Sequence, residues 1–523
     1  MITQVEILVG LIPFIPAFMG FLVSIIYVLT RSRALVFSST ILALLLVTAF
    51  STIVAVSVFQ EHQVVVFRAA GWPAPIGIVY MVDMPTAILL VVTSFILLAI
   101  AIYSTDYIVD QGYPWYSILL LGASSGILGV ICTGDMFNLF VMLEVTAISS
   151  YALVMYYMNR ADSIVSGLKY AFIGALGTTL YLLAMGITYS VFGTLNFADL
   201  SQKLRSPMDT TLVYVAYGLI MLVSFWAFSI KSGVFPNHFW LPDAHPAAPT
   251  PISALLSGLV VNTGVIGLYK FIYIASWSTP SSPLPPAIGS AKYFVSLLAI
   301  ATGVVSAIVG ALLMYIQTDV KRLIAYSTVM NLGYLFMAAG CANEKGLNAL
   351  LFYMTMHSLA KATLFLSAGV FIQAAGTRNL EKLAGLGTRY RVAGLSLVLS
   401  VLTLAGVPPL PGFLAKLLLY EALFEYNIAF AIAMVVASAI GLISYMKMLY
   451  VILLGLRVVE PAEVRMPLAN LALVILVAFI VFGIAFLASP WLLRVIYIRA
   501  SEQLTMNIES YIAKLEQFIL RPS

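Results

Sequence analysis

Long uninterrupted apolar runs restrict the fold of this chain more than any other feature. Two examples are "ILALLLVTAFSTIVAVSVF" at residues 41–59 and "LALVILVAFIVFGIAFLA" at residues 471–488. A helix of about 20 apolar residues crosses a bilayer, and only helices or closed barrels satisfy the backbone there. The runs lack the alternation of a barrel strand, so they predict helices. Only 9% of the 523 residues are charged, which is typical of an integral membrane protein and not of a soluble domain.

The runs predict an all-α polytopic membrane protein with about 14 transmembrane helices. The predicted spans are residues 5–28, 34–58, 80–104, 115–133, 136–158, 164–192, 211–234, 251–277, 291–316, 322–341, 347–373, 393–427, 430–455 and 468–490. Five prolines follow the seventh span within residues 236–251, and the overlong twelfth contains "AGVPPLPGF", so both are predicted to be broken. Beyond the last span, an amphipathic helix is predicted from one apolar face, formed by Leu504, Ile508, Tyr511, Leu515 and Phe518.

Basic residues are distributed unevenly between the two sets of loops. Loops after odd-numbered spans hold eleven lysines and arginines, and loops after even-numbered spans hold five. Cytoplasmic loops carry the excess of positive charge. We therefore expect a multi-pass protein of the cell membrane with both termini on the non-cytoplasmic side.

Unusual residues recur at a nearly constant distance along the chain. The pairs are Asp135 and Asp319, Lys169 and Lys361, Lys231 and Lys416, and Lys270 and Lys447, which are 184, 192, 185 and 177 residues apart. A unit of five helices contains an odd number of spans, so the second copy starts on the opposite side of the membrane from the first. The two copies are therefore inverted relative to each other, as in transporters built from inverted repeats. The predicted divisions are helices 1–3 (1–110), a first repeat of helices 4–8 (111–280), a second repeat of helices 9–13 (281–455), and the last span with its amphipathic helix (456–523). Chance spacing of a few charges is the alternative.

The chain carries no sequence signature of catalysis or of cofactor binding. It has no nucleophile elbow, phosphate-binding loop or dinucleotide fingerprint. Cys132 and Cys341 lie in apolar segments without a CxxC spacing, and they are interpreted as free buried thiols. We expect no cofactor, no metal site and no nucleic-acid partner, because loop cations account for the net charge of +5.

Ionisable side chains inside the predicted spans are the main candidates for function, because charge in a bilayer is costly. They are Glu144, Lys169, Lys231, Lys270, His357, Lys361, Lys416, Glu421 and Lys447. We expect Glu144 near mid-membrane to pair with a lysine that carries protons as its solvation changes. A static Glu–Lys pair that only fixes helix packing is the alternative.

Histidines add candidate proton carriers. His357 and Lys361 are four residues apart, so they share a helical face and are predicted to relay protons between the repeats. A hydrogen bond from His357 to a neighbouring helix is the structural alternative. His238, Asp243 and His245 lie in the first break, where hydrogen bonds that brace the loop are favoured over a role in ion access. The break candidates also include Pro236, Pro408 and Pro409.

Several long motifs then identify a family. They are "GDMFNLFVMLEVTAISSYAL", "KSGVFPNHFWLPDAHPAAPTPISALL", "QTDVKRLIAYSTVMNLGY", "HSLAKATLFL" and "AGVPPLPGFLAK". From about residue 80 to 450 the chain resembles the antiporter-like subunits shared by respiratory complex I, Mrp-type sodium/proton antiporters and group 4 membrane-bound hydrogenases. The segments "GDMFNLFV" and "GTLNFADL" are most similar to the Mrp D subunit and its relatives in membrane-bound hydrogenase or sulfur-reducing complexes.

The resemblance implies 14 helices with inverted repeats at helices 4–8 and 9–13. By motif match it makes Glu144 the helix 5 carboxylate, Lys231 the helix 7 lysine, His357 and Lys361 the helix 11 relay, and Lys416 the helix 12 group. The resemblance also implies that the chain translocates protons or sodium ions as one of several membrane subunits of a complex. That complex is driven by a redox reaction or by an ion gradient. One position departs from the pattern, because Asn262 stands where most relatives have a helix 8 lysine. Lys270 is eight residues on, about 12 Å along a helix, and cannot replace it.

The leading hypothesis is an ion-translocating subunit that conducts through Glu144, Lys231, Asn262, His357, Lys361 and Lys416. It has no catalytic chemistry of its own, although its complex can be an oxidoreductase. The second hypothesis is a degenerate subunit that acts as a scaffold or coupling element, which Asn262 motivates. A transporter of an organic solute is the weakest hypothesis, because the polar residues form a line and not a clustered pocket.

Overall fold

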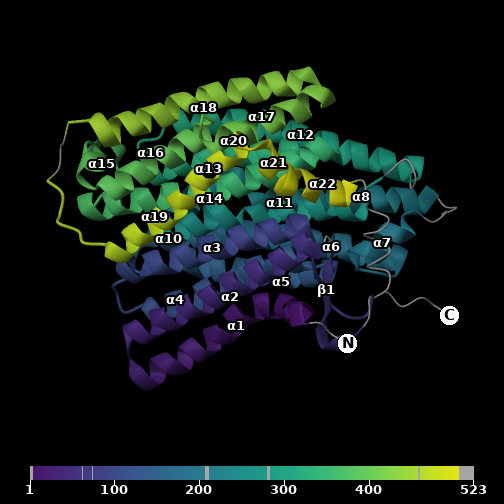
Figure 1. The fold of residues 1–523 in the computed structure, drawn as a ribbon, viewed down its shortest axis with the longest axis horizontal. Coiled ribbons are helices and arrows are strands. Elements are labelled where there is room, and N and C mark those ends of the chain that lie inside the picture. Colours follow the sequence, from purple (N-terminus) through teal and green to yellow (C-terminus); the bar gives the residue numbers. More distant parts are fainter. Residues whose placement is uncertain are drawn as a thin grey trace.

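The chain folds into one bundle of membrane helices. The computed structural model describes residues 4–61, 63–72, 75–205, 211–278, 283–456 and 460–505. Within these ranges, 13 helices are long and apolar enough to cross a membrane, and they run side by side (Figure 1). The predicted all-α membrane fold is confirmed. The remaining predicted span is the broken twelfth, and it consists of two shorter helices, α16 (Arg391–Ala405) and α17 (Pro411–Tyr426).

Three helices and a small sheet precede the predicted repeats. The helices are α1 (Gln4–Thr30), α2 (Arg33–Glu61) and α3 (Met84–Tyr107). Between α2 and α3, strands β1 (Val65–Arg68) and β2 (Val79–Val82) pair antiparallel, with Val65 opposite Val82. This sheet was not predicted, because two short runs of β-branched residues do not stand out in so apolar a chain. Asp83 then caps α3 by accepting a hydrogen bond from the Thr86 backbone N–H.

The next helical elements correspond to the predicted first repeat. They are α4 (Tyr113–Cys132), α5 (Met136–Val154), α6 (Ala161–Phe192), α7 (Phe197–Lys203), α8 (Thr211–Ser232), the 3₁₀ turn η2 (Asn237–Trp240), α9 (Leu241–Ala247), α10 (Thr250–Leu255), α11 (Asn262–Tyr269), and the π-helical turns η3 (Leu256–Val260) and η4 (Lys270–Ala275). The eighth predicted span is therefore one continuous helical column, in which the α-helices α10 and α11 are each followed by a π-helical turn, η3 and η4. Short π-helical turns of this kind occur often at functional sites.

The rest of the described chain forms the predicted second repeat and a last span. Its elements are α12 (Pro286–Tyr315), α13 (Val320–Gly340), α14 (Glu344–Ala375), η5 (Leu380–Leu383), α15 (Leu386–Arg389), α16, α17, α18 (Ile428–Leu454), α19 (Pro467–Phe482), α20 (Ile484–Ala488), α21 (Pro490–Leu493), η6 (Arg494–Ile498) and α22 (Arg499–Thr505). Of the predicted amphipathic helix, Leu504 is buried in α22, and its other apolar residues lie outside the described residues.

The two predicted breaks begin with the same backbone turn. Gly233 and Gly406 both adopt a left-handed conformation, with φ of 66° and 79°. The next backbone N–H reaches back five residues, from Val234 to Ser229 and from Val407 to Leu402. This is the Schellman turn that ends helices, and the prolines that follow prevent the helix from resuming at once. The breaks in helices 7 and 12 are confirmed. Lys231 precedes its glycine, whereas Lys416 follows Gly406 on the next helix, so the two lysines are not at matching positions of the break.

A second backbone motif also occurs once in each predicted repeat. An isolated antiparallel bridge joins Asp135 to Asn196, and an equivalent bridge joins Asp319 to Asn379. The helices before Asn196 and Asn379, α6 and α14, have 32 residues each and end at a left-handed glycine. This agrees with a repeat offset of 183 or 184 residues, whereas Lys169 and Lys361 are 192 apart and do not match in register. The inverted orientation of the repeats stays a prediction.

Burial separates the helices into an outer and an inner set. The α10–η4 column, α13 and α14 are almost wholly buried, whereas α1, α18 and α19 leave broad apolar faces exposed for the lipid to cover. Nearly every polar side chain of the inner set therefore lies among other helices. This position in the bundle is where charged residues are tolerated in a membrane protein.

Candidate functional site

Buried charges lie on the inner helices and beside the two breaks. Five lysines of the described residues are at most 8% exposed. They are Lys231, Lys270, Lys321, Lys361 and Lys416, and they are joined by the buried polar side chains of His245, Asn262 and His357. Each must find an acceptor inside the protein, because burial of an unpaired charge costs several kcal/mol.

Glu144 and Lys231 form the first contact of the candidate site, as predicted from the sequence. The Lys231 Nζ lies 3.9 Å from the Glu144 Oε1, with the two side chains 8% and 31% exposed. Neither atom has a hydrogen-bond partner among the described residues. The pair is therefore in electrostatic contact without a direct hydrogen bond, and a small displacement or a bridging water changes its strength.

The α11 helix packs tightly against α8 just beyond Lys231. A Cβ added to Gly264 would lie 2.3 Å from the Ser232 Oγ and 2.5 Å from the Phe228 carbonyl oxygen, so only glycine allows this approach. The Ser232 Oγ is buried without a hydrogen-bond partner among the described residues. Close packing thus brings the polar end of α8 beside the start of α11.

Asn262 connects this region to α14. Its Nδ2 donates hydrogen bonds to the Gly258 carbonyl oxygen and to the Ser358 Oγ, each at 2.8 Å. Its Oδ1 is buried and has no partner among the described residues. The residue that departs from the family pattern therefore makes a direct contact between the two predicted repeats.

His357 and Lys361 lie on α14 near Ser358 but contact different neighbours. The Lys361 Nζ donates to the Ile324 carbonyl oxygen at 3.2 Å and to the Ser327 Oγ, both on α13. His357 lines a cavity of about 10 Å³, beside Thr403 and Gly412 at the second break. That volume holds about one water molecule, and neither ring nitrogen of His357 has a partner among the described residues. The structural alternative, a hydrogen bond from His357 to a neighbouring helix, is thus not observed.

A polar network continues from Lys361 toward the second break. Asn331, one turn after Ser327, donates to the Tyr445 hydroxyl at 3.3 Å and accepts from the Tyr353 hydroxyl at 2.7 Å. The Tyr353 ring packs edge-on against Tyr334, with centroids 5.8 Å apart. None of Ser327, Asn331, Tyr353 and Tyr445 was predicted to belong to the site. The four-residue spacing of Ser327 and Asn331 within an apolar span was the available signal.

Lys416 lies at the far end of this network. Its Nζ donates to the Ala405 carbonyl oxygen at 2.8 Å and to the Ser438 Oγ at 2.6 Å, and it lies 5.7 Å from the centroid of the Tyr334 ring. Ala405 is the last residue of α16, so the ammonium faces the negative end of a helix dipole. Lys231 is likewise in the last turn of its own helix. Both lysines are therefore next to the C-terminus of a half-helix.

The ammonium groups of Lys270 and Lys447 contact the ends of other helices and do not belong to this line. The Lys270 Nζ donates to the Ile131 and Thr133 carbonyl oxygens at the end of α4, at 3.1 and 2.7 Å. The Lys447 Nζ donates to the Tyr315 carbonyl oxygen at the end of α12, at 3.2 Å. Each lysine satisfies carbonyl groups that a helix terminus leaves free. Both lysines donate to carbonyl groups at the end of a helix, which agrees with the predicted repeat. Within the described chain, neither lysine donates a hydrogen bond to a residue of the proposed conduction path.

The first break carries a separate group of charges. Asp243 accepts from the Lys169 Nζ at 2.6 Å and from an Arg322 nitrogen at 2.7 Å, which ties α9 to α6 and α13. Pro236 is exposed, as are Pro408 and Pro409 at the second break.

The histidines of the break were predicted to brace it by hydrogen bonds, and the ring of His245 does not do so within the described chain. The His238 ring stacks on Phe235, and the His245 ring on Phe365. The His238 Nδ1 and both ring nitrogens of His245 are buried without partners among the described residues. The backbone provides the bracing instead, because the Ser253 hydroxyl and the Lys321 ammonium donate to the His245 carbonyl oxygen.

The remaining predictions from the sequence concern cysteines and metals. Cys132 and Cys341 are buried free thiols, as predicted. In the part of the chain that the structure describes, no group of three or more histidine, cysteine, aspartate or glutamate side chains is placed to hold one metal ion.

Comparisons with known proteins agree with the fold. The family model described as "NADH:quinone oxidoreductase/Mrp antiporter, TM" matches residues 133–441. The chain is 32% identical to the N subunit of NADH-quinone oxidoreductase from Desulforudis audaxviator, over 72% of both chains. It is 30% identical to the D subunit of the Na(+)/H(+) antiporter from Alkalihalophilus pseudofirmus, over 78% of both chains.

Two solved complexes contain chains of the same fold. A chain of the membrane-bound sulfane sulfur reductase, an archaeal respiratory membrane complex, superimposes with a TM-score of 0.85 at 25% identity, over 98% of this chain and 100% of the other. A chain of the Mrp complex from Dietzia sp. superimposes with a TM-score of 0.82 at 24% identity, over the same shares.

Proposed function

This chain belongs to the NADH:quinone oxidoreductase/Mrp antiporter family of membrane subunits, and from this premise we propose that it is an ion-translocating subunit of a multisubunit membrane complex. It moves protons, or exchanges protons for sodium ions, through Glu144, Lys231, Asn262, His357, Lys361 and Lys416. Its partners are the other membrane subunits of that complex. Similarity to these relatives supports either a gradient-driven antiporter or a redox-driven complex as the host.

One observation carries this proposal: a series of buried polar contacts extends across the middle of the bundle. It begins at the Glu144–Lys231 pair, crosses from α11 to α14 at the Asn262–Ser358 hydrogen bond, and reaches α13 through Lys361. Asn331 and the tyrosines around it extend the series toward Lys416. Charges placed for packing alone need not follow one another from the first break to the second.

Several polar atoms along this line are suited to bind water. The Lys231 Nζ, the Ser232 Oγ, the Asn262 Oδ1 and both ring nitrogens of His357 are buried without a partner among the described residues. Buried polar atoms of this kind are usually satisfied by ordered water, and chains of water and side chains carry protons between sites. We therefore infer that water completes the path on both sides of Asn262.

Asn262 also supports a second candidate function. An amide does not exchange a proton charge, so a path that depends on this position conducts less well than one with a lysine there. In that case the subunit acts chiefly as a coupling element or as a scaffold for the neighbouring subunits. The direct Asn262–Ser358 contact favours conduction, because it keeps a hydrogen-bonding group at the junction of the two predicted repeats.

The topology that accompanies the proposed function is an inverted pair of five-helix repeats. The paired bridges at Asp135 and Asp319, the paired turns at Gly233 and Gly406, and the capping lysines Lys270 and Lys447 support the repeat. Inversion, the division at residues 111–280 and 281–455, and termini on the non-cytoplasmic side remain part of this proposal. Labelling of single cysteines introduced into the loops, with a reagent that cannot cross the membrane, tests the orientation.

Replacement of Lys361 by methionine in the intact complex tests conduction. Methionine keeps the length and the apolar contacts of the side chain but cannot carry a proton, so proton or sodium flux in proteoliposomes should fall at least tenfold. Lys447→Met is the matched control, because this partly lipid-facing lysine only caps α12. Unchanged flux in a correctly assembled Lys361→Met complex would favour the scaffold function and reject conduction along this line.

A further inference from the structure

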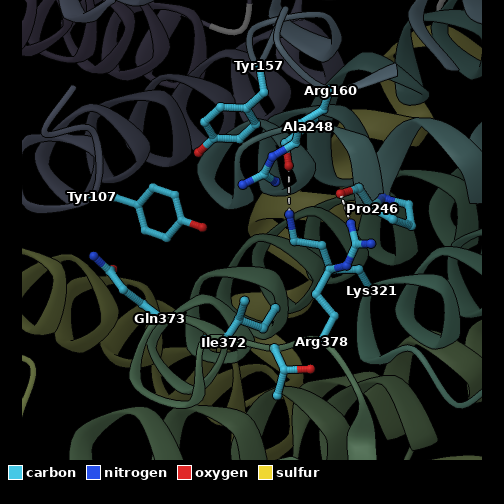
Figure 2. A pocket seen from close by; sticks show the side chains of 11 residues that line it. Tyr107, Tyr157, Arg160, Pro246, Ala248, Lys321, Ile372, Gln373 and Arg378 are labelled. Carbon is cyan, nitrogen blue, oxygen red and sulfur yellow. Dashed lines mark hydrogen bonds between the residues drawn. The ribbon is translucent and has the colours of Figure 1, made fainter. Parts of the chain in front are cut away.

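A polar cavity of about 430 Å³ lies outside the proposed conduction path. It is formed where the ends of α3, α9, α13 and α14 meet the loop between α5 and α6, and its lining is shown in Figure 2. These helix ends all belong to the side of the membrane on which the loop cations are concentrated. The cavity is therefore at the membrane boundary, beside the first break.

The lining is strongly cationic. Arg160, Lys321 and Arg378 line the cavity, and none of its described lining residues is acidic. The nearest ion pair joins the Arg378 Nε to the Asp319 Oδ2 at 3.1 Å, which neutralises one of the three charges. A net excess of positive charge in a walled cavity raises the local concentration of anions.

Each cation is held in place by a different contact. The Lys321 Nζ donates to the Ala248 carbonyl oxygen at 2.8 Å, and Arg378 donates to the Pro246 carbonyl oxygen (Figure 2). The Arg160 guanidinium lies over the Tyr157 ring, 4.6 Å from its centroid. The Asp319 carboxylate acts on Lys321 as well as on Arg378, and the Lys321 Nζ also donates to the His245 carbonyl oxygen. The Arg160 guanidinium makes no hydrogen bond or ion pair within the described chain, so its donors are available for an anion.

Neutral donors complete the lining. Figure 2 shows the Tyr107 hydroxyl at the end of α3 approaching the same space as the Tyr157 hydroxyl and the Arg160 guanidinium, which both come from the loop between α5 and α6. Burial raises the pKa of the Tyr157 hydroxyl above its ordinary value, so this group stays protonated and can donate. The Gln373 Oε1 is buried without a partner among the described residues, and its amide can turn to present its NH₂ group.

We propose that this cavity binds the phosphate group of an anionic ligand, carried either by a phospholipid headgroup or by inorganic phosphate. Guanidinium groups hold phosphate oxygens through paired, charge-assisted hydrogen bonds, and tyrosine hydroxyls and lysine supply further donors. Basic pockets between membrane helices at the cationic face bind anionic headgroups. A bound phosphate joins the first break, through Lys321 and Arg378, to the loop that follows the Glu144 helix.

The test compares the purified intact complex with two variants, Arg160→Gln and Arg389→Gln. The Arg160 side chain stacks on the Tyr157 ring and makes no hydrogen bond or ion pair with another described residue, so its replacement should leave the fold intact. Arg389 is an exposed arginine of α15 on the same side of the bundle and is the matched control. Native mass spectrometry measures binding of cardiolipin, phosphatidylglycerol and phosphatidylcholine, and phosphorus NMR measures binding of inorganic phosphate.

The expected result is binding at least tenfold weaker in Arg160→Gln than in the wild type or in Arg389→Gln. Loss confined to cardiolipin and phosphatidylglycerol identifies a lipid headgroup, and loss confined to inorganic phosphate identifies the free anion. Three results overturn the proposal: no phosphate-bearing probe binds, Arg160→Gln binds every probe as the wild type does, or the intact complex places an acidic side chain of a neighbouring subunit in the cavity.

Discussion

Replacement of Glu144 by glutamine is the sharpest perturbation of the proposed path. It removes one charge next to Lys231 and changes the volume of the side chain little. At the observed 3.9 Å, two unit charges attract by about 4 kcal/mol at an effective dielectric constant of about 20. Glu144 is 31% exposed, so we take about half of this value, ~2 kcal/mol, as the loss after solvent screening.

The loss falls on the protonated form of Lys231, because only the ammonium is attracted by the carboxylate. Burial of that ammonium still costs the same free energy after the substitution. A change of about 2 kcal/mol lowers the population of a charged intermediate by up to about 30-fold. If the protonated lysine is an obligatory intermediate, ion flux should fall by a similar factor under limiting proton supply.

The assay is proton uptake by inverted membrane vesicles that contain the complete complex, followed with a pH-sensitive dye and normalised to assembled complex. Glu421→Gln is the control, because Glu421 is 54% exposed and pairs with Lys345 at the surface. Glu144→Asp keeps the charge and should retain part of the flux. A Glu144→Gln complex that assembles normally and transports within twofold of the wild type would refute the reasoning.

Two further predictions concern stability. Burial raises the pKa of Asp135, which caps α5, from 3.8 to about 6, so the folded state binds this proton more tightly. The resulting stabilisation is complete below about pH 4 and is lost as the pH rises through about 6. Asp135→Asn should remove this part of the pH dependence of the melting temperature in detergent, and an unchanged slope would contradict it. At the second break, a Cβ on Gly412 would lie 1.7 Å from the Thr403 carbonyl oxygen, so Gly412→Ala should cost about 1–3 kcal/mol. Gly186→Ala, where nothing lies within 4 Å, is the control, and equal melting temperatures would disprove the packing argument.

Helix positions and the two breaks could be predicted from the sequence because their causes are local. A span of apolar residues is visible as composition, and the turns at Gly233 and Gly406 are each followed directly by proline-rich sequence. A contact between Glu144 and a lysine was also predicted, since few partners for a carboxylate exist at that depth, and the structure identifies that lysine as Lys231. The β1–β2 sheet was missed, because its strands are short and as apolar as the helices around them.

The roles of individual lysines could not be predicted, because they depend on which helices are neighbours. Lys270 and Lys447 are as conspicuous in the sequence as Lys361, yet they cap α4 and α12. Lys321 was counted as an ordinary loop cation, although it is buried and braces the first break. Periodicity shows which face of a helix carries a charge but not which carbonyl group lies opposite it.

The contacts of α14 place a limit on how this helix can change during evolution. Within two turns, Ser358 accepts from Asn262, His357 faces the second break, and Lys361 donates to α13. Each added residue turns the following part of a helix by about 100°. One insertion between the capping residue Asn343 and His357 would therefore redirect all three side chains at once. The geometry of the site therefore depends on the number of residues in this half of α14 as much as on their chemical identity.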